Sequence, residues 1–185
     1  MNARTLFRPV AAALLAAGCL AAHAGPVDAL TWTVANTDGG NGVATIAPDS
    51  LTLVSADFTG SPDQAFVPTL LTATVALAAG TTISFDWAYT TADDGGSNND
   101  VFGWLLDGQF QALSAGDSFD PQSGRFSLVL DHDAVFGLAM NSVDGWGGSA
   151  TAVVTDFTAV PEPATLPLAA AALGGLLLAG KRRRG

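Results

Sequence analysis

Between residues 30 and 158, apolar residues recur in short runs in which they alternate with small polar residues. Residues 82–89 are the clearest example, because every second side chain is Ile, Phe, Trp or Tyr. A period of two predicts β-strands, and the Gly, Asp, Asn, Ser and Pro residues between the runs predict turns. The strands expected from this pattern are residues 30–34, 50–54, 71–77, 82–89, 101–106, 125–130, 134–140 and 150–157.

No run of ten or more residues in this middle region has helical spacing. Eight or nine strands in about 136 residues predict an all-β fold, an antiparallel β-sandwich of jelly-roll type. The absence of an internal repeat in the sequence argues against a solenoid. Four aromatic residues at inward-compatible spacing are expected in its core, although rings on a sandwich face can also stack on sugars. These residues are Phe85, Trp87, Phe102 and Trp104.

The first 24 residues have the organisation of a secretory signal peptide. Two arginines precede an apolar stretch at residues 10–22, and Ala22 and Ala24 stand where signal peptidase requires small residues. This stretch is too short to span a bilayer core of roughly 30 Å, so we expect it to be removed. The alternative is a lipoprotein signal at Cys19, although Ala16 stands where such signals commonly carry leucine.

The chain ends with an apolar run at residues 164–180 that is followed by four consecutive cations. Seventeen residues at 1.5 Å per residue span about 25 Å, which is short but sufficient for a transmembrane helix. The positive-inside rule places the basic end in the cytoplasm and residues 25–159 outside. A buried C-terminal helix of a soluble domain is the alternative, and it leaves the terminal cations unexplained.

Residues 160–185 resemble a PEP-CTERM sorting signal, with a Pro-Glu-Pro motif, a short apolar span and an arginine-rich end. The resemblance implies export by a Gram-negative bacterium that makes exopolysaccharide, followed by removal of the tail by an exosortase. It divides the chain into a signal peptide (1–24), an acidic ectodomain (25–159) and a sorting signal (160–185). Residues 85–108 are similar to a segment that is common in such ectodomains. The residues implied in processing are Ala22, Ala24, Pro161, Glu162, Pro163, Arg182, Arg183 and Arg184.

The charges are divided between these segments. Residues 25–160 contain all 16 aspartates and a single cation, Arg125, so their net charge is −15. Such a surface excludes nucleic acid as a partner, because phosphate binding needs a basic surface. Divalent cations would relieve the repulsion within the domain and could bridge it to anionic exopolysaccharide or to another copy.

The densest polar segment is residues 90–100, which combine aspartate, asparagine and glycine between two predicted strands. Calcium takes six to eight oxygen ligands on flexible loops of this composition. The spacing does not match an EF-hand. The alternative is a solvated hairpin loop, because the same residues are common turn formers. The candidate ligands for calcium are Asp93, Asp94, Asn98, Asn99 and Asp100.

Trp146 lies in a glycine-flanked turn, Asp-Gly-Trp-Gly-Gly, that should expose its ring. An exposed indole is a candidate platform for stacking on a sugar, and the alternative is a ring that folds back to cap one end of the sandwich.

Catalytic residues are sparse. After signal removal the sequence retains one histidine, His132, which is flanked by two aspartates and is expected in an exposed turn. A Gly-x-Ser-x-Gly motif is absent, and no pair of aspartates stands in a recognisable glycosidase motif. We therefore expect a protein that is not an enzyme.

Together these features predict an exported protein of the cell surface or exopolysaccharide matrix, anchored in the inner membrane until its tail is processed. Its expected role is structural or adhesive and non-catalytic. The first alternative is a calcium-assisted carbohydrate-binding module, and the second is a glycan-active enzyme.

Overall fold

The computed structural model describes residues 27–58, 63 and 66–161. The signal peptide and the apolar and basic parts of the sorting signal lie outside these residues. The described elements are η1 (Val27–Ala29), β1 (Thr33–Asn36), β2 (Val43–Ala47), β3 (Ser50–Val54), β4 (Thr69–Leu77), β5 (Thr81–Thr91), η2 (Gly96–Asn98), β6 (Asp100–Leu106), β7 (Gln109–Ala112), β8 (Gln122–Val129), β9 (Ala134–Ser142) and β10 (Ala150–Pro161).

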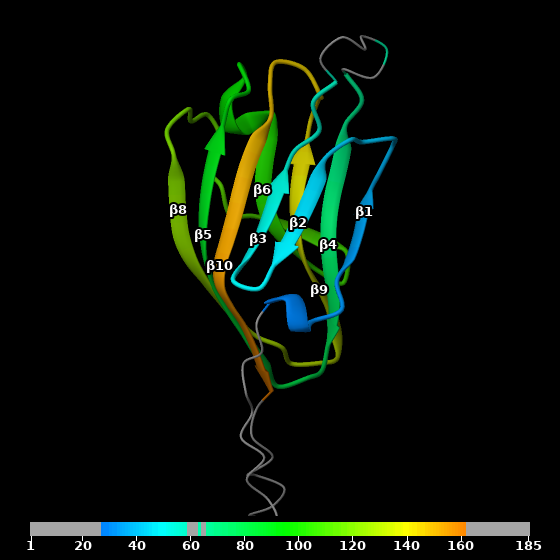
Figure 1. The fold of residues 1–185 in the computed structure, drawn as a ribbon, viewed down its shortest axis with the longest axis vertical. Helices are drawn as coiled ribbons and strands as arrows, with labels where there is room; N and C mark the ends of the chain where they lie inside the picture. The colour runs from blue at the N-terminus through cyan, green and yellow to red at the C-terminus, as the bar shows by residue number, and fades with distance from the viewer. Residues whose placement is uncertain (1–26, 59–62, 64–65, 162–185) are drawn as a thin grey trace, which may run out of the picture. The chain divides into compact units, whose positions relative to one another are not determined.

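The strands form two five-stranded sheets, β1-β4-β9-β6-β7 and β2-β3-β10-β5-β8 (Figure 1). Every pair of neighbouring strands is antiparallel. The chain changes sheet at each connection except the β2–β3 and β6–β7 hairpins, and the order of β3 to β10 is that of a jelly roll. The predicted all-β antiparallel sandwich is confirmed.

Three edge strands differ from the sequence prediction. Residues 30–34 were expected as a strand, but β1 begins at Thr33 because Leu30 and Trp32 pack toward the core before the ladder begins. The Trp32 ring stands 5.4 Å from the Phe157 ring. β2 and β7 were not predicted. They are short edge strands with little burial, so their sequences carry only a weak alternation of apolar residues.

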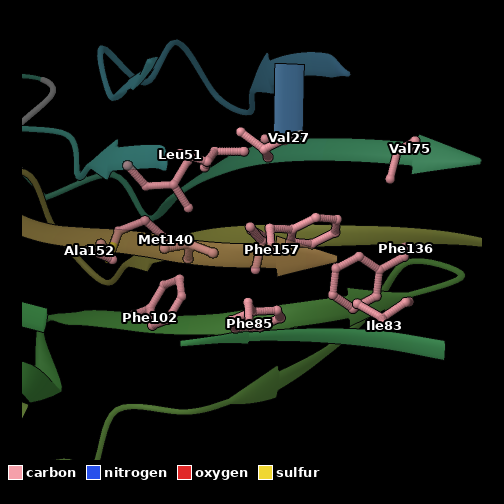
Figure 2. Packing of buried hydrophobic residues seen from close by; sticks show 14 of the residues in the cluster. Val27, Leu51, Val75, Ile83, Phe85, Phe102, Phe136, Met140, Ala152 and Phe157 are labelled. Carbon is pink, nitrogen blue, oxygen red and sulfur yellow. The ribbon is translucent and has the colours of Figure 1, made fainter. Parts of the chain in front are cut away.

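The hydrophobic core lies between the two sheets (Figure 2). Phe85 and Phe102, both predicted to be inside, are 1% and 0% exposed. Trp87 and Trp104, also expected there, are partly buried and pack against this core. The buried members of the core cluster run from Val27 to Phe157. The segment of residues 25–161 therefore contains the whole described core. We refer to this segment as the 25–161 domain.

The two ends of the sandwich differ in character (Figure 1). At one end, which we call the loop end, lie the described residues 55–58, 66–68, 92–99, 113–121 and 143–149. At the opposite end, which we call the exit end, β10 finishes with Pro161 paired to Thr81. The ladder thus continues two residues past the predicted domain boundary at 159, and Pro161 is extended. Within the described residues, no helix has the length and apolar character needed to cross a membrane.

Candidate functional site

Two loops from different parts of the chain are joined at the loop end. In the β5–β6 loop, the Ala92 amide donates to the Ser149 carbonyl at 3.0 Å. In return the Val143 amide of the β9–β10 loop donates to the Asn99 carbonyl at 2.7 Å. The loop that carries the predicted calcium ligands is therefore fixed against the loop that carries Trp146.

Two glycines allow this close approach. Gly147 and Gly148 have φ angles of +93° and +126°, which favour glycine strongly. A Cβ on Gly147 would lie 2.4 Å from Asp94 Oδ1, and one on Gly148 would lie 2.5 Å from the Ala92 carbonyl oxygen. The two glycines that follow Trp146 therefore let the β9–β10 loop pack closely against the β5–β6 loop.

Trp146 is 45% exposed, so its predicted exposure is confirmed. It does not belong to the core cluster. Its ring stacks on Phe66, with centroids 6.4 Å apart and planes 23° apart, and Phe66 is itself 71% exposed. The backbone amide of Trp146 donates to Asp144 Oδ1 at 3.1 Å. The result is a solvent-facing aromatic pair whose tryptophan is tied to an acidic side chain.

A third exposed aromatic residue lies on the neighbouring β7–β8 loop. Phe119 is 66% exposed. Its loop is held on η2, because the Ser97 amide donates to the Ser118 carbonyl at 3.0 Å and the Ser118 amide donates to Ser97 Oγ at 3.1 Å. The sequence does not single out Phe66 or Phe119, since isolated phenylalanines in loops give no periodic signal.

Asp93 and Asp100 are carboxylates buried beneath these loops. Asp93 is 2% exposed, and its Oδ1 accepts hydrogen bonds from the Gly95 amide at 2.6 Å and from Asn99 Nδ2 at 3.0 Å. Its Oδ2 is buried without a partner. Asp100 is 0% exposed, and both of its carboxylate oxygens are buried without a partner. Asn99 Nδ2 also lies 3.5 Å from Asp144 Oδ2.

The electrostatics follow from this burial. Burial raises the pKa of Asp100 to about 6, against the opposing pull of the nearby Ser142 and Ser55 hydroxyls. Neither hydroxyl completes a hydrogen bond to the carboxylate in this arrangement, and Ser55 Oγ accepts from the Ala150 amide at 2.8 Å. Burial, and after it the charge of Asp144, also raise the pKa of Asp93.

The other predicted ligands lie apart from the buried carboxylates. Asp94 is exposed and lies over Gly147. Asn98 is exposed and donates from Nδ2 to Asp117, so its amide faces the β7–β8 loop. In the part of the chain that the structure describes, no group of three His, Cys, Asp or Glu side chains is arranged to hold a metal ion. The structure therefore brings Asp93, Asn99 and Asp100 together with Asp144, and directs Asn98 elsewhere.

His132 lies in the β8–β9 connection at the exit end, opposite the loop end, and is exposed as predicted. Its Nδ1 is 2.5 Å from Asp131 Oδ1 and its Nε2 is 2.8 Å from Asp107 Oδ2. These two contacts raise the pKa of His132, that of Asp107 first. Since carboxylates engage both ring nitrogens, this histidine does not activate a serine hydroxyl in this arrangement.

A concave surface lies beside the β6–β7 hairpin. This groove of about 480 Å³ is lined by a tryptophan, a leucine, an aspartate and two glutamines. Trp104 also packs on the core rings, with its centroid 5.2 Å from that of Phe126. The groove thus combines apolar and polar side chains. Its lining residues are Trp104, Leu106, Asp107, Gln109 and Gln111.

No protein-family model matches this chain, and no curated protein matches it. Several solved structures resemble its fold. A CBM4 module is 12% identical, with 71% of this chain and 86% of that chain covered at a TM-score of 0.36. A CBM61 module solved with β-1,4-galactotriose is 10% identical, with 75% and 92% covered at 0.37. A CBM22-1 xylan-binding domain from Paenibacillus barcinonensis is 12% identical, with 74% and 89% covered at 0.32. Scores and identities of this size do not show a shared family or a shared ligand.

Proposed function

We propose that the protein is an exported, non-catalytic surface or matrix protein that adheres to polysaccharide through its loop end. The observation that carries this proposal is the exposed, stacked pair of Trp146 and Phe66 at the end opposite Pro161. Stacked rings offer a flat apolar face of the kind that sugar rings cover, and adjacent polar loops supply hydrogen bonds.

The sorting part of the proposal rests on the sequence. The PEP-CTERM-like tail begins at the exit end, because Pro161 is the last residue of β10. A chain held by that tail would have its loop end on the far side of the sandwich from its attachment. The aromatic pair would then face away from the point of attachment for as long as the tail is present.

The non-catalytic part of the proposal rests on the sequence, which carries no recognisable glycosidase motif, and burial further excludes the two aspartates beneath the loop end. A glycosidase needs two carboxyl groups that reach the scissile bond. Asp93 and Asp100 are 2% and 0% exposed, so neither reaches a substrate at the surface. His132 is accessible but is paired with two carboxylates at the opposite end.

The test is binding of the 25–161 domain to an array of neutral and acidic bacterial polysaccharides, followed by affinity measurements on the best ligand. Trp146→Ala and Phe66→Ala should each weaken binding about tenfold or more, as expected for loss of an aromatic anchor. Phe119→Ala is the matched control, because it removes an equally exposed ring from a neighbouring loop.

Three results would contradict the proposal. The first is the absence of any polysaccharide ligand, and the second is equal loss of affinity in all three variants. The third is a loss confined to Gln109→Ala and Gln111→Ala, which would place binding in the groove beside the β6–β7 hairpin.

A further inference from the structure

Unpartnered polar atoms are concentrated in one place at the loop end. In the described part of the chain, the buried side-chain oxygens or nitrogens without a hydrogen-bond partner are Asp93 Oδ2, both carboxylate oxygens of Asp100 and Ser142 Oγ. Asp100 and Ser142 are paired across the β6–β9 ladder. Buried polar atoms in folded proteins are nearly all hydrogen-bonded, so a cluster of four exceptions indicates a missing partner.

A partner that carries positive charge would offset the burial of these carboxylates. An ionised carboxylate offers about four acceptor sites, and burying it without compensation is costly. The donors that the loops supply are neutral amides: Gly95 N and Asn99 Nδ2 donate to Asp93 Oδ1, and Trp146 N donates to Asp144 Oδ1. No lysine or arginine is available, because the single cation of the ectodomain, Arg125, pairs with Asp86 in the middle of β5.

We propose that this cluster is a calcium site in which Asp93 and Asp100 are the charged ligands. Asp144 adds a third carboxylate at the edge of the cluster, and Ser142 contributes a neutral oxygen. Since the described side chains do not form a ready cage of three acidic groups, backbone carbonyls and water complete the six to eight ligands that calcium takes. The donor set is made of hard oxygens, which favours calcium over zinc or copper.

The site differs from a generic attraction of cations to an acidic domain. It is buried, it excludes Asn98, and it joins two loops that are 45 residues apart in the sequence, as the Asn99 to Asp144 contact shows. The inference does not rest on polysaccharide binding, because its ligands are distinct from Trp146 and Phe66.

The test compares thermal melting of the 25–161 domain at pH 7 in chelator and in millimolar calcium, at matched ionic strength. We expect calcium to raise the melting temperature of the native domain. Asp100→Asn and Asp93→Asn should abolish this shift, while each retains an oxygen acceptor of the same shape. Asp120→Asn is the control, since it removes one exposed charge at the same end and should leave the shift intact.

A direct probe accompanies the melts and does not depend on variant stability. Tyr89 is the single tyrosine of the chain, and its hydroxyl donates to the Asp100 backbone carbonyl at 2.5 Å. Terbium, which replaces calcium at oxygen sites, should therefore show luminescence sensitised through Tyr89 and lose it when calcium is added.

Three outcomes would overturn the inference. One is an unchanged melting temperature in millimolar calcium. Another is a calcium shift that Asp100→Asn and Asp93→Asn both retain, which would indicate screening of the acidic surface. The last is terbium luminescence that calcium does not displace. Loss of polysaccharide binding with an intact calcium shift would contradict only the proposed function.

Discussion

Asp100 is held at the first position of β6, where the strand begins beneath the loop end. Its side chain is 0% exposed, and its charge is opposed by burial and by the nearby charge of Asp93. A leucine or asparagine at this position would avoid that cost. The proposed calcium ion would offset this cost, and so would a proton, which binds the carboxyl group as the pH falls below its pKa of about 6.

The metal-free domain should become more stable as the pH falls from 7 to 4. The pKa of Asp100 is raised from 3.8 to about 6, so its contribution is full below about 3.8 and is lost as the pH rises through about 6. The free energy of unfolding should gain on the order of 3 kcal/mol from this group over that range. Urea unfolding of metal-free native and Asp100→Asn domains measures the difference, and parallel pH profiles would show that Asp100 is not responsible.

His132 should titrate above its ordinary pKa of 6.5, because Asp107 and Asp131 hold its charged form. Its contribution to stability is present below pH 6.5 and is lost as the pH rises through the higher folded value. The pKa values of both aspartates are lowered, so their contributions are lost at the acid side, as the pH falls below 3.8.

An NMR titration of the His132 ring tests this arrangement. Asp107→Asn should lower the histidine pKa, while Asp133→Asn should not, because the Asp133 carboxylate accepts from the Ala79 amide instead. A His132 pKa at or below 6.5 in the native protein would show that the two contacts do not persist in solution.

At the scale of elements, the β9–β10 loop connects the two features of the loop end. It carries Trp146 and Asp144, and its glycines lie against the β5–β6 loop. Order imposed on Asp144 by a bound ion would therefore restrict the turn that presents Trp146. Calcium should increase polysaccharide affinity without contacting the sugar, and chelation should reduce it.

Gly148→Ala should be more destabilising than Gly108→Ala. Both glycines have positive φ angles, +126° and +79°, so both substitutions introduce backbone strain of order 1 kcal/mol. A Cβ at Gly108 meets no atom within 4 Å, whereas one at Gly148 clashes with the Ala92 backbone carbonyl oxygen at 2.5 Å. Chemical denaturation of the two variants gives the comparison, and equal losses would mean that the loop contact adds nothing.

The strands that cross the core are predictable from sequence because burial imposes alternation on them. β3 spans Ser50–Val54 as expected, and β5 keeps Phe85 and Tyr89 on its inner face. Edge strands β2 and β7 are not predicted, because little of their surface is buried and burial therefore imposes no clear alternation on their sequences. Phe66 is not predicted because its partner, Trp146, is distant in sequence, and the contact depends on how two loops are placed by the sandwich.

The acidic loop between β5 and β6 is likewise only partly predictable from the sequence. Its composition indicates oxygen ligands, which the burial of Asp93 and Asp100 supports. Composition does not distinguish Asn98, which contacts Asp117, from Asn99, which contacts Asp93. That difference arises from the turn at η2, which sends neighbouring side chains to opposite loops.

At the scale of the whole molecule, the sandwich has a loop end, which carries the proposed polysaccharide site, and an exit end. The proposed sorting signal starts at Pro161, where the last ladder pair with Thr81 closes. The proposed attachment and the proposed recognition thus lie at opposite ends of the β-domain, and a net charge of −15 should oppose association of copies at low salt.

Tail processing can be measured in an exosortase-bearing host. The full chain should lose its tail, and a Pro161→Ala, Pro163→Ala double variant should retain it and stay with the membrane. Arg125→Ala, in the middle of β8, should be processed normally. Equal processing of the double variant and the native chain would contradict the predicted role of the Pro-Glu-Pro motif in tail removal.

The most direct test of polysaccharide recognition is to map the ligand on the 25–161 domain by NMR. On addition of the best polysaccharide fragment from the array, in calcium, we expect perturbation of the Trp146 indole and of the amides of Phe66, Val67 and residues 143–149. Perturbation restricted to the groove around Gln109 and Gln111, or to the exit end around His132, would contradict it.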